Sequence, residues 1–204
     1  MRVREVLVVG ACVTLLAGCA AEKADPPGLT ASPTPAARPS APEPTPTERT
    51  ATDLSDPELG IVFDDIPDVT GAAASAHDAA AIFEVENWRS TTTGSVSPAL
   101  APFVSPELLR KVEYSVQRNA EDGWSFDGTM HITISDVVVD AATATVSVCS
   151  DYENVLFISS DGTPPQTFEE LGVSRFERTT TRLSTFDDGA TWRPEDTTFE
   201  GESC

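Results

Sequence analysis

The sequence predicts an α+β fold in which helices come first and an antiparallel sheet follows. Three observations predict it. Residues 72–89 are rich in alanine with apolar positions at helical spacing, and the motif Ser105-Pro106-Glu107 is typical of a helix start. From residue 130 onward, apolar residues recur at every second position, as in strands with one buried face. With 204 residues, the chain has room for one ordinary domain and additional segments.

The first 18 residues have the layout of a signal peptide. Two arginines precede an apolar run over residues 6–16, and a helix that spans a membrane needs about 20 apolar residues. The next motif, Leu16-Ala17-Gly18-Cys19, resembles a bacterial lipobox. The resemblance implies that Cys19 receives a diacylglycerol, which would anchor the mature chain on the extracytoplasmic face of the cell membrane. The alternative is an ordinary signal peptide followed by an unrelated cysteine.

Two further segments precede the expected domain, which spans residues 72–204. Residues 19–56 are rich in Pro, Thr and Ala, and they cannot bury enough apolar area to offset their ordering entropy, so we expect a disordered tether. Residues 57–71 mix carboxylates with apolar side chains such as Val62, Phe63 and Ile66. We expect this acidic collar to pack back onto the domain, and the alternative is a docking segment for a partner.

Two helices are predicted at the start of the domain. The first covers residues 72–89 and has one apolar stripe. The second begins with Ser105 as its N-cap and Pro106 in its first position, and it extends to about Gln117. The residues expected to be buried are Ala76, Ala79, Ala80, Phe83 and Val85 in the first helix, and Leu108, Leu109, Val112 and Val116 in the second.

Alternating residues predict the strands that follow. Met130, Ile132 and Ile134 alternate with polar residues, residues 142–149 do the same, and a turn at Asp140-Ala141 joins the two strands as a hairpin. Two more strands are predicted over residues 176–183 and 191–199, with turns at residues 161–162 and 188–189. Pro194 cannot donate to a strand ladder, so the last strand should lie at an edge or carry a bulge.

The predicted order of elements, two helices followed by two hairpins, resembles that of a known protein family. Together with Val-Ser-Val-Cys-Ser-Asp at residues 146–151, Asp-Gly-Ala-Thr-Trp-Arg at 188–193 and the terminal Cys204, it is similar to small actinobacterial surface lipoproteins with a nuclear-transport-factor-2-like cone fold. The resemblance covers residues 72–204. It implies a curved sheet that closes over helices around a pocket, and it implies little chemistry. Pro194 departs from the apolar residue expected after Trp192-Arg193.

The cysteines predict one disulfide. Cys12 lies in the signal peptide and leaves with it, and Cys19 is expected to carry the lipid. Cys149 and Cys204 remain, and an exported domain usually pairs its cysteines. The alternative is two separate thiols.

Charge and missing motifs exclude several function classes. The formal net charge is −20, which disfavours binding to nucleic acid. The chain has no Gly-rich phosphate loop, zinc-protease motif, nucleophile elbow or paired CxxC, and we expect neither a cofactor nor a metal. Asp187-Asp188-Gly189 fits a hairpin turn and lacks the spaced oxygen ligands of a calcium loop.

Four residues are candidates for a pocket. Asp151 is an acid inside a strand motif, where it acts either in a pocket or as a structural hydrogen-bonding group beside the disulfide. His131 lies on the strand face opposite Met130, which is either the solvent face or the cavity face of a cone. Arg178 and Arg182 share one strand face, where they either present cations to an anionic ligand or pair with acids across strands. His77 is expected to be a solvated residue on a helix flank.

These observations favour a non-enzymatic lipoprotein domain that binds a small molecule or another envelope protein. The alternative is a cone-fold enzyme, resembling ketosteroid isomerases or polyketide cyclases, with Asp151 or His131 as acid and base. A structural spacer is a third hypothesis, which a fully filled cavity would favour.

Overall fold

The structure is a computed structural model that describes residues 50–204. The expected signal peptide, the lipobox with Cys19 and residues 19–49 of the expected tether lie outside the described residues. Within residues 50–204, the structure contains no helix that is long and apolar enough to cross a membrane.

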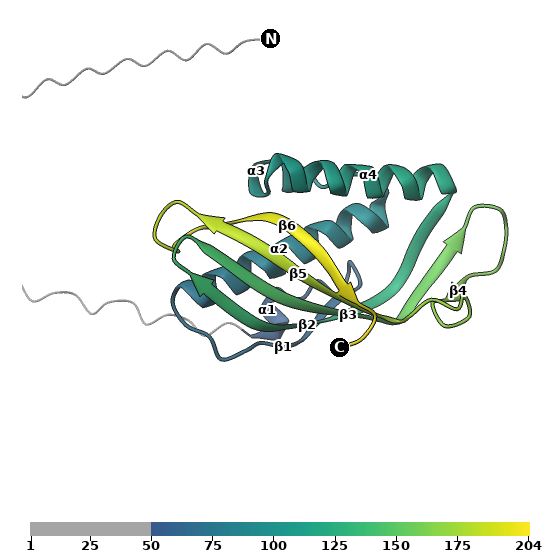
Figure 1. The fold of residues 1–204 in the computed structure, drawn as a ribbon. Coiled ribbons are helices and arrows are strands. Elements are labelled where there is room, and N and C mark those ends of the chain that lie inside the picture. Colours follow the sequence, from purple (N-terminus) through teal and green to yellow (C-terminus); the bar gives the residue numbers. More distant parts are fainter. Residues whose placement is uncertain (1–49) are drawn as a thin grey trace, which may run out of the picture. The chain divides into compact units, whose positions relative to one another are not determined.

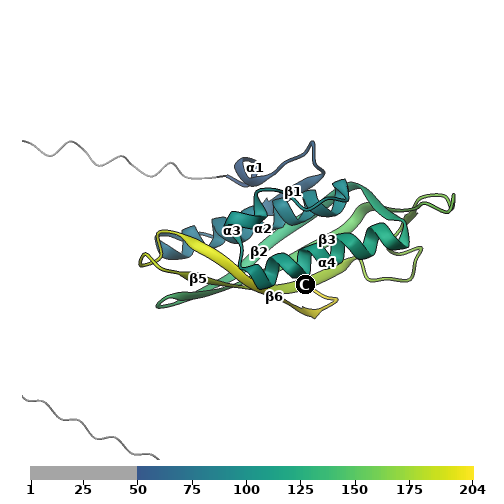
Figure 2. The same ribbon diagram turned by 90° about the horizontal axis from the view of Figure 1, so that it is seen from above.

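The described part of the chain is a mixed α+β unit with helices on one face of a curved, unclosed sheet (Figures 1 and 2). The sheet order is β1-β2-β3-β5-β6, and the short β4 pairs with β3. Only β1 runs parallel to its neighbour. The strands are β1 (Ile61–Asp65), β2 (Trp124–Asp140), β3 (Thr143–Ser159), β4 (Gln166–Thr167), β5 (Phe176–Thr185) and β6 (Trp192–Gly201).

The two long helices confirm the predicted helix positions and extend further than predicted. They are α2 (Ala72–Thr93) and α4 (Pro106–Asp122), and the short helices are α1 (Ala51–Leu54) and α3 (Leu100–Phe103). At the start of α4, the Ser105 hydroxyl accepts a hydrogen bond from the Leu108 N–H at 3.1 Å and donates one to the Glu195 carbonyl at 2.8 Å. The predicted N-cap therefore also joins α4 to the edge strand β6. Leu109 and Val85 are only partly buried, and the other apolar residues predicted for these helices are buried.

The predicted hairpin of β2 and β3 is confirmed, with both strands longer than predicted. Pro194 lies in β6, which is an edge strand. The pairing of β5 with β6 also shifts beside Pro194, because β6 has one residue more than β5 between the pairs Arg182–Asp196 and Leu183–Pro194. Both features allow a residue without an N–H donor to lie in a strand.

The predicted collar packs onto the domain, as expected, and its residues 61–65 form a strand of the sheet, β1, although the collar was assigned outside the domain. Ile61 and Phe63 in β1 are almost fully buried, and β1 pairs with β2. Gly60 makes this possible, because it has a φ of +76° and a Cβ at this position would fall on the carbonyl oxygen of Gly128 in β2. The folded unit therefore begins before residue 72. It also includes α1 within the expected tether, where the Asp53 carboxylate accepts a hydrogen bond from the Thr50 N–H at 2.8 Å.

The core lies between the helices and the sheet face that they cover, called the inner face below. It joins alanines of α2 to the apolar residues of β1, β2 and β3. His77 is 1% exposed within this helix, so the prediction of a solvated His77 was wrong. Its neighbours Ala76, Ala80 and Ala81 are small, and the helix can therefore approach the sheet closely enough to bury the imidazole.

Cys149 in β3 and the terminal Cys204 form the predicted disulfide, with their Cα atoms 5.9 Å apart. The bridge joins the end of the chain, just beyond β6, to a central strand. It closes a loop of 55 residues.

Candidate functional site

A cavity of about 650 Å³ lies between the inner face of the sheet and the two long helices. Six aromatic side chains form much of its wall, and they contact one another as a nearly continuous layer: Trp88, Trp124, Phe126, Tyr152, Phe157 and Phe168. The rings of Tyr152 and Phe168 are stacked with centroids 4.8 Å apart, and Phe126 meets Phe157 edge to face at 5.8 Å. The cavity therefore offers flat apolar surfaces to a ligand.

The strand register explains why the four rings carried by β2 and β3 share one face of the sheet. Trp124 and Phe126 are two residues apart in β2, and Phe126 lies opposite Phe157 in β3. Between the pairs Thr129–Asn154 and His131–Asp151, β3 has one residue more than β2. This bulge changes the parity of β3, so that Tyr152 lies on the inner face on one side of it and Phe157 on the other.

The helices contribute mostly polar side chains to the cavity wall, beside the aromatic Trp88. On α2, the side chains that line the cavity follow helical spacing, namely Glu84, Asn87, Trp88 and Thr91. On α4, Ser115 and Asn119 are four residues apart and also line it. Leu171 and Val173, from the segment between β4 and β5, contribute to the wall near Phe168.

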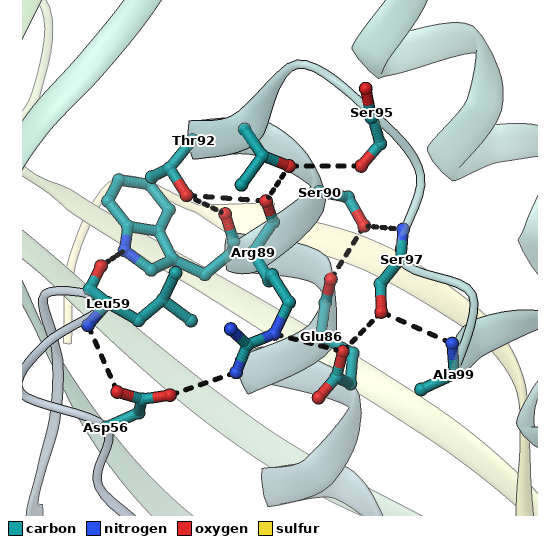
Figure 3. A network of polar contacts seen from close by, with 11 residues as sticks. Asp56, Leu59, Glu86, Arg89, Ser90, Thr92, Ser95, Ser97 and Ala99 are labelled. Atoms are coloured by element: carbon teal, nitrogen blue, oxygen red, sulfur yellow. Dashed lines mark hydrogen bonds and ion pairs between the residues drawn. The ribbon is translucent and has the colours of Figure 1, made fainter.

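Polar contacts hold the segment before β1 against α2, and Figure 3 shows them around Asp56, Leu59 and Arg89. The indole N–H of Trp88 donates to the Leu59 carbonyl at 3.1 Å. The next residue, Arg89, forms ion pairs with Asp56 at 2.9 Å and with Glu86 at 3.3 Å. The segment before β1 is thereby attached to α2, and the Trp88 ring is fixed against Phe126 and Tyr152.

Two acids and one phenol form the ionisable part of the cavity. The Tyr152 hydroxyl donates a hydrogen bond to Glu177 Oε2 at 3.1 Å. Glu84 is 8% exposed, and burial together with the negative charge of Glu177 raises its pKa to about 8. Burial, and then the charges of Glu177 and Glu84, raise the pKa of Tyr152 above its ordinary value. At neutral pH, Glu84 is therefore largely protonated and Tyr152 is a neutral donor.

The four residues predicted for the pocket lie on the other face of the sheet and do not line the cavity. His131 Nδ1 lies 2.7 Å from Asp64 Oδ1, and Asp151 forms an ion pair with Arg175 at 3.1 Å. Arg178 donates to the Cys204 carbonyl at 2.8 Å, and Arg182 lies opposite Asp196 in β6. Pairing with acids across strands was the favoured expectation for these two arginines, and Arg182 has Asp196 as its cross-strand neighbour.

Strand parity explains why the predicted pocket residues of β5 do not line the cavity. In β5, the cavity residue Glu177 has the same parity as the buried Thr181 and Leu183, and the two arginines have the opposite parity.

The signal for Glu84 was present in the sequence, because Glu84 lies four residues after Ala80 and four before Trp88. An acid at that position in an apolar stripe indicates a buried carboxyl group.

The turn at residues 187–189 fits its prediction. Asp187 Oδ1 accepts hydrogen bonds from the Thr185 hydroxyl and from the Thr191 N–H, both at 2.8 Å. Within residues 50–204, no group of three or more His, Cys, Asp or Glu side chains is arranged to hold a metal ion.

Similarity to known proteins is found among solved structures. No family model and no curated protein matches the chain. Among solved structures, the intermembrane space region of the chloroplast protein ARC6 is similar, with a TM-score of 0.48 and 13% sequence identity. The match covers 65% of this chain and 98% of that one. At this level of similarity, nothing about the function of this chain follows from it.

Proposed function

We propose that this chain is a lipoprotein, anchored through Cys19 on the extracytoplasmic face of the cell membrane, whose domain binds a small apolar molecule without transforming it. The observation that carries the binding proposal is the aromatic cavity with a buried carboxyl group in its wall. A domain that served only as a spacer would gain stability by filling this space with side chains. The cavity is also of the size that proteins use for small ligands, about 300–1,000 Å³.

The finer description of the fold is part of the proposal. The nuclear-transport-factor-2-like cone has helices that lie in the concavity of a bent sheet, and the order of elements here is compatible with it. Bulges in β2 and β3 help the sheet to curve around the cavity. A pocket between helices and curved sheet is the feature that the sequence resemblance implies.

Binding is tested with N-phenyl-1-naphthylamine, a neutral probe that becomes fluorescent in apolar sites. We expect the purified chain to bind it with micromolar affinity. A double variant, Asn87→Phe with Asn119→Phe, places added bulk into the cavity from both helices and should weaken binding at least tenfold. Gln117→Phe is the matched control, because Gln117 is exposed on α4 and does not line the cavity. Equal affinity in both variants, or no binding by the wild type, would refute this site.

The anchor is tested separately. We expect the chain to partition into the membrane fraction and to carry added lipid mass on Cys19, because two or more acyl chains give stable anchoring. Cys19→Ser should release it from that fraction. A variant that remains bound like the wild type would refute the lipid anchor and leave the binding proposal unaffected.

An enzyme is the second candidate, with a different residue from those predicted. The buried Glu84, with its raised pKa in an apolar cavity, has the character of a proton-transferring carboxyl group. A suitable probe is 5-nitrobenzisoxazole, from which a base removes the C3 proton as the N–O bond breaks and a coloured phenolate forms. Turnover that rises with pH toward a plateau above about 8, and that Glu84→Gln abolishes, would favour this candidate over simple binding.

A further inference from the structure

The ionisable residues that line the cavity are all acids. Glu84 comes from α2 and Glu177 from β5, and Tyr152 lies between them on β3. Among residues 50–204, no Lys, Arg or His lines the cavity. The nearby Arg175 is already engaged outside it, with Asp151 at 3.1 Å and Glu153 at 3.0 Å.

The Glu84 carboxyl group is the least satisfied of these groups. It lines the cavity from a residue that is more than nine-tenths buried. Burial and the charge of Glu177 cause its pKa shift, and no hydrogen bond from residues 50–204 contributes to it. A buried acid without such a bond is costly unless a partner from outside the protein compensates it.

Aromatic walls beside acids favour one class of ligand. The face of an aromatic ring attracts a cation, and most strongly when the cation has lost its water. Trp88, Tyr152 and Phe168 lie near the acids and offer such faces, with Tyr152 contacting both other rings. An anion would instead lie beside Glu177, whose repulsion is strong in an apolar site.

From this arrangement we infer that the ligand is an organic cation, an amine or quaternary ammonium group carried on an apolar body, with the cationic group between Glu84 and Glu177. The inference deepens the proposed function and rests on it. A bare ammonium ion would leave most of the roughly 650 Å³ unfilled, so the apolar body is required to occupy the remaining aromatic surface. The bound cation would let both carboxyl groups ionise, so binding near neutral pH releases a proton.

The test uses two probes of the same shape and different charge. Benzyltrimethylammonium is a cation, and neopentylbenzene is its neutral isostere with carbon in place of nitrogen. Binding is followed by the tryptophan fluorescence of the purified chain, because Trp88 and Trp124 line the cavity. We expect the cation to bind at least tenfold more tightly than the isostere.

Two variants test whether the acids of the cavity cause the preference for the cation. Glu177→Gln should weaken cation binding at least tenfold and leave the isostere unchanged, whereas Glu113→Gln removes the same charge from an exposed position on α4 and should change neither. A second pair of probes needs no variant. N-phenyl-1-naphthylamine should bind more tightly than 1-anilinonaphthalene-8-sulfonate, which has the same rings and a negative charge.

Several results would overturn the inference that the ligand is an organic cation. Equal affinity for the cation and its isostere, tighter binding of the isostere, or tighter binding of the sulfonate overturns the inference while a neutral ligand remains compatible with the proposed function. Failure of all four probes to bind overturns both. A preference for the cation that Glu113→Gln weakens as much as Glu177→Gln assigns it to the overall negative charge and also overturns the inference.

Discussion

The raised pKa of Glu84 makes the stability of the domain depend on pH in a direction that can be calculated. In the folded chain Glu84 keeps its proton up to a pH of about 8, whereas in the unfolded chain it loses the proton near its ordinary pKa of 4.5. Between these values unfolding releases a proton, so the free energy of unfolding falls as pH rises. Below pH 4.5 both states are protonated and Glu84 contributes nothing to the slope.

The magnitude follows from the gap of about 3.5 pH units between the two values. At about 1.4 kcal/mol per unit, the whole window corresponds to about 5 kcal/mol, of which about 3 kcal/mol is lost by pH 7. This is a large share of the 5–15 kcal/mol that typically stabilises a domain. Glu84→Gln has nearly the same shape and no charge, so it should remove this slope and make the domain more stable than the wild type above pH 7.

Urea unfolding at pH 5, 6, 7 and 8, followed by circular dichroism, measures the effect as the difference between wild type and variant. The difference cancels the contributions of the other titratable groups. Asp187, Glu195 and Asp196 have lowered pKa values and titrate below this window. Glu113→Gln should retain the wild-type slope. Parallel curves for the wild type and Glu84→Gln from pH 5 to 8 would show that Glu84 is ionised in the folded chain, and the reasoning would fail.

Two further predictions concern the connections of the fold. Replacing either Cys149 or Cys204 by Ser should lower the free energy of unfolding by about 4 kcal/mol, from the entropy of the 55-residue loop, and replacing both should cost no more than replacing one. Calorimetry of the three variants checks this, and additive losses would contradict it. Ser105→Ala should cost about 1–2 kcal/mol in urea unfolding, because it removes the N-cap of α4 and the hydrogen bond to the Glu195 carbonyl. Ser115→Ala, in the middle of the same helix, removes no cap and should cost much less.

Local patterns predicted most of the elements, because each pattern reports on a few neighbouring residues. Ser105 and Pro106 identified the start of α4, and alternation identified the β2–β3 hairpin. The disulfide followed from elimination among four cysteines. These inferences require no knowledge of which distant segments lie side by side.

The site could not be predicted in the same way, because it depends on parity across bulges. Asp151 and Tyr152 are adjacent in sequence, yet only Tyr152 lines the cavity. The extra residue of β3 that brings Phe157 to the same face as Tyr152 leaves no mark in the hydrophobic pattern. Glu84 was missed for another reason, because the prediction of the alanine-rich helix rests on its apolar stripe and does not depend on the acid within that stripe.

The boundary of the domain can be tested through one glycine. Gly60 and Gly94 both have left-handed backbone, with φ values of +76° and +66°, and alanine at either position costs roughly 1–2 kcal/mol of backbone strain. Gly94 faces open space, whereas a Cβ at Gly60 overlaps the Gly128 carbonyl and would force β1 away from β2. Gly60→Ala should therefore lose about 1–3 kcal/mol more than Gly94→Ala in urea unfolding. It should also expose Trp88, whose indole donates to the Leu59 carbonyl, and shift its fluorescence to longer wavelength. Equal losses in the two variants would mean that β1 adds little to the folded unit, and the domain would then begin near residue 72, where the sequence pattern places it.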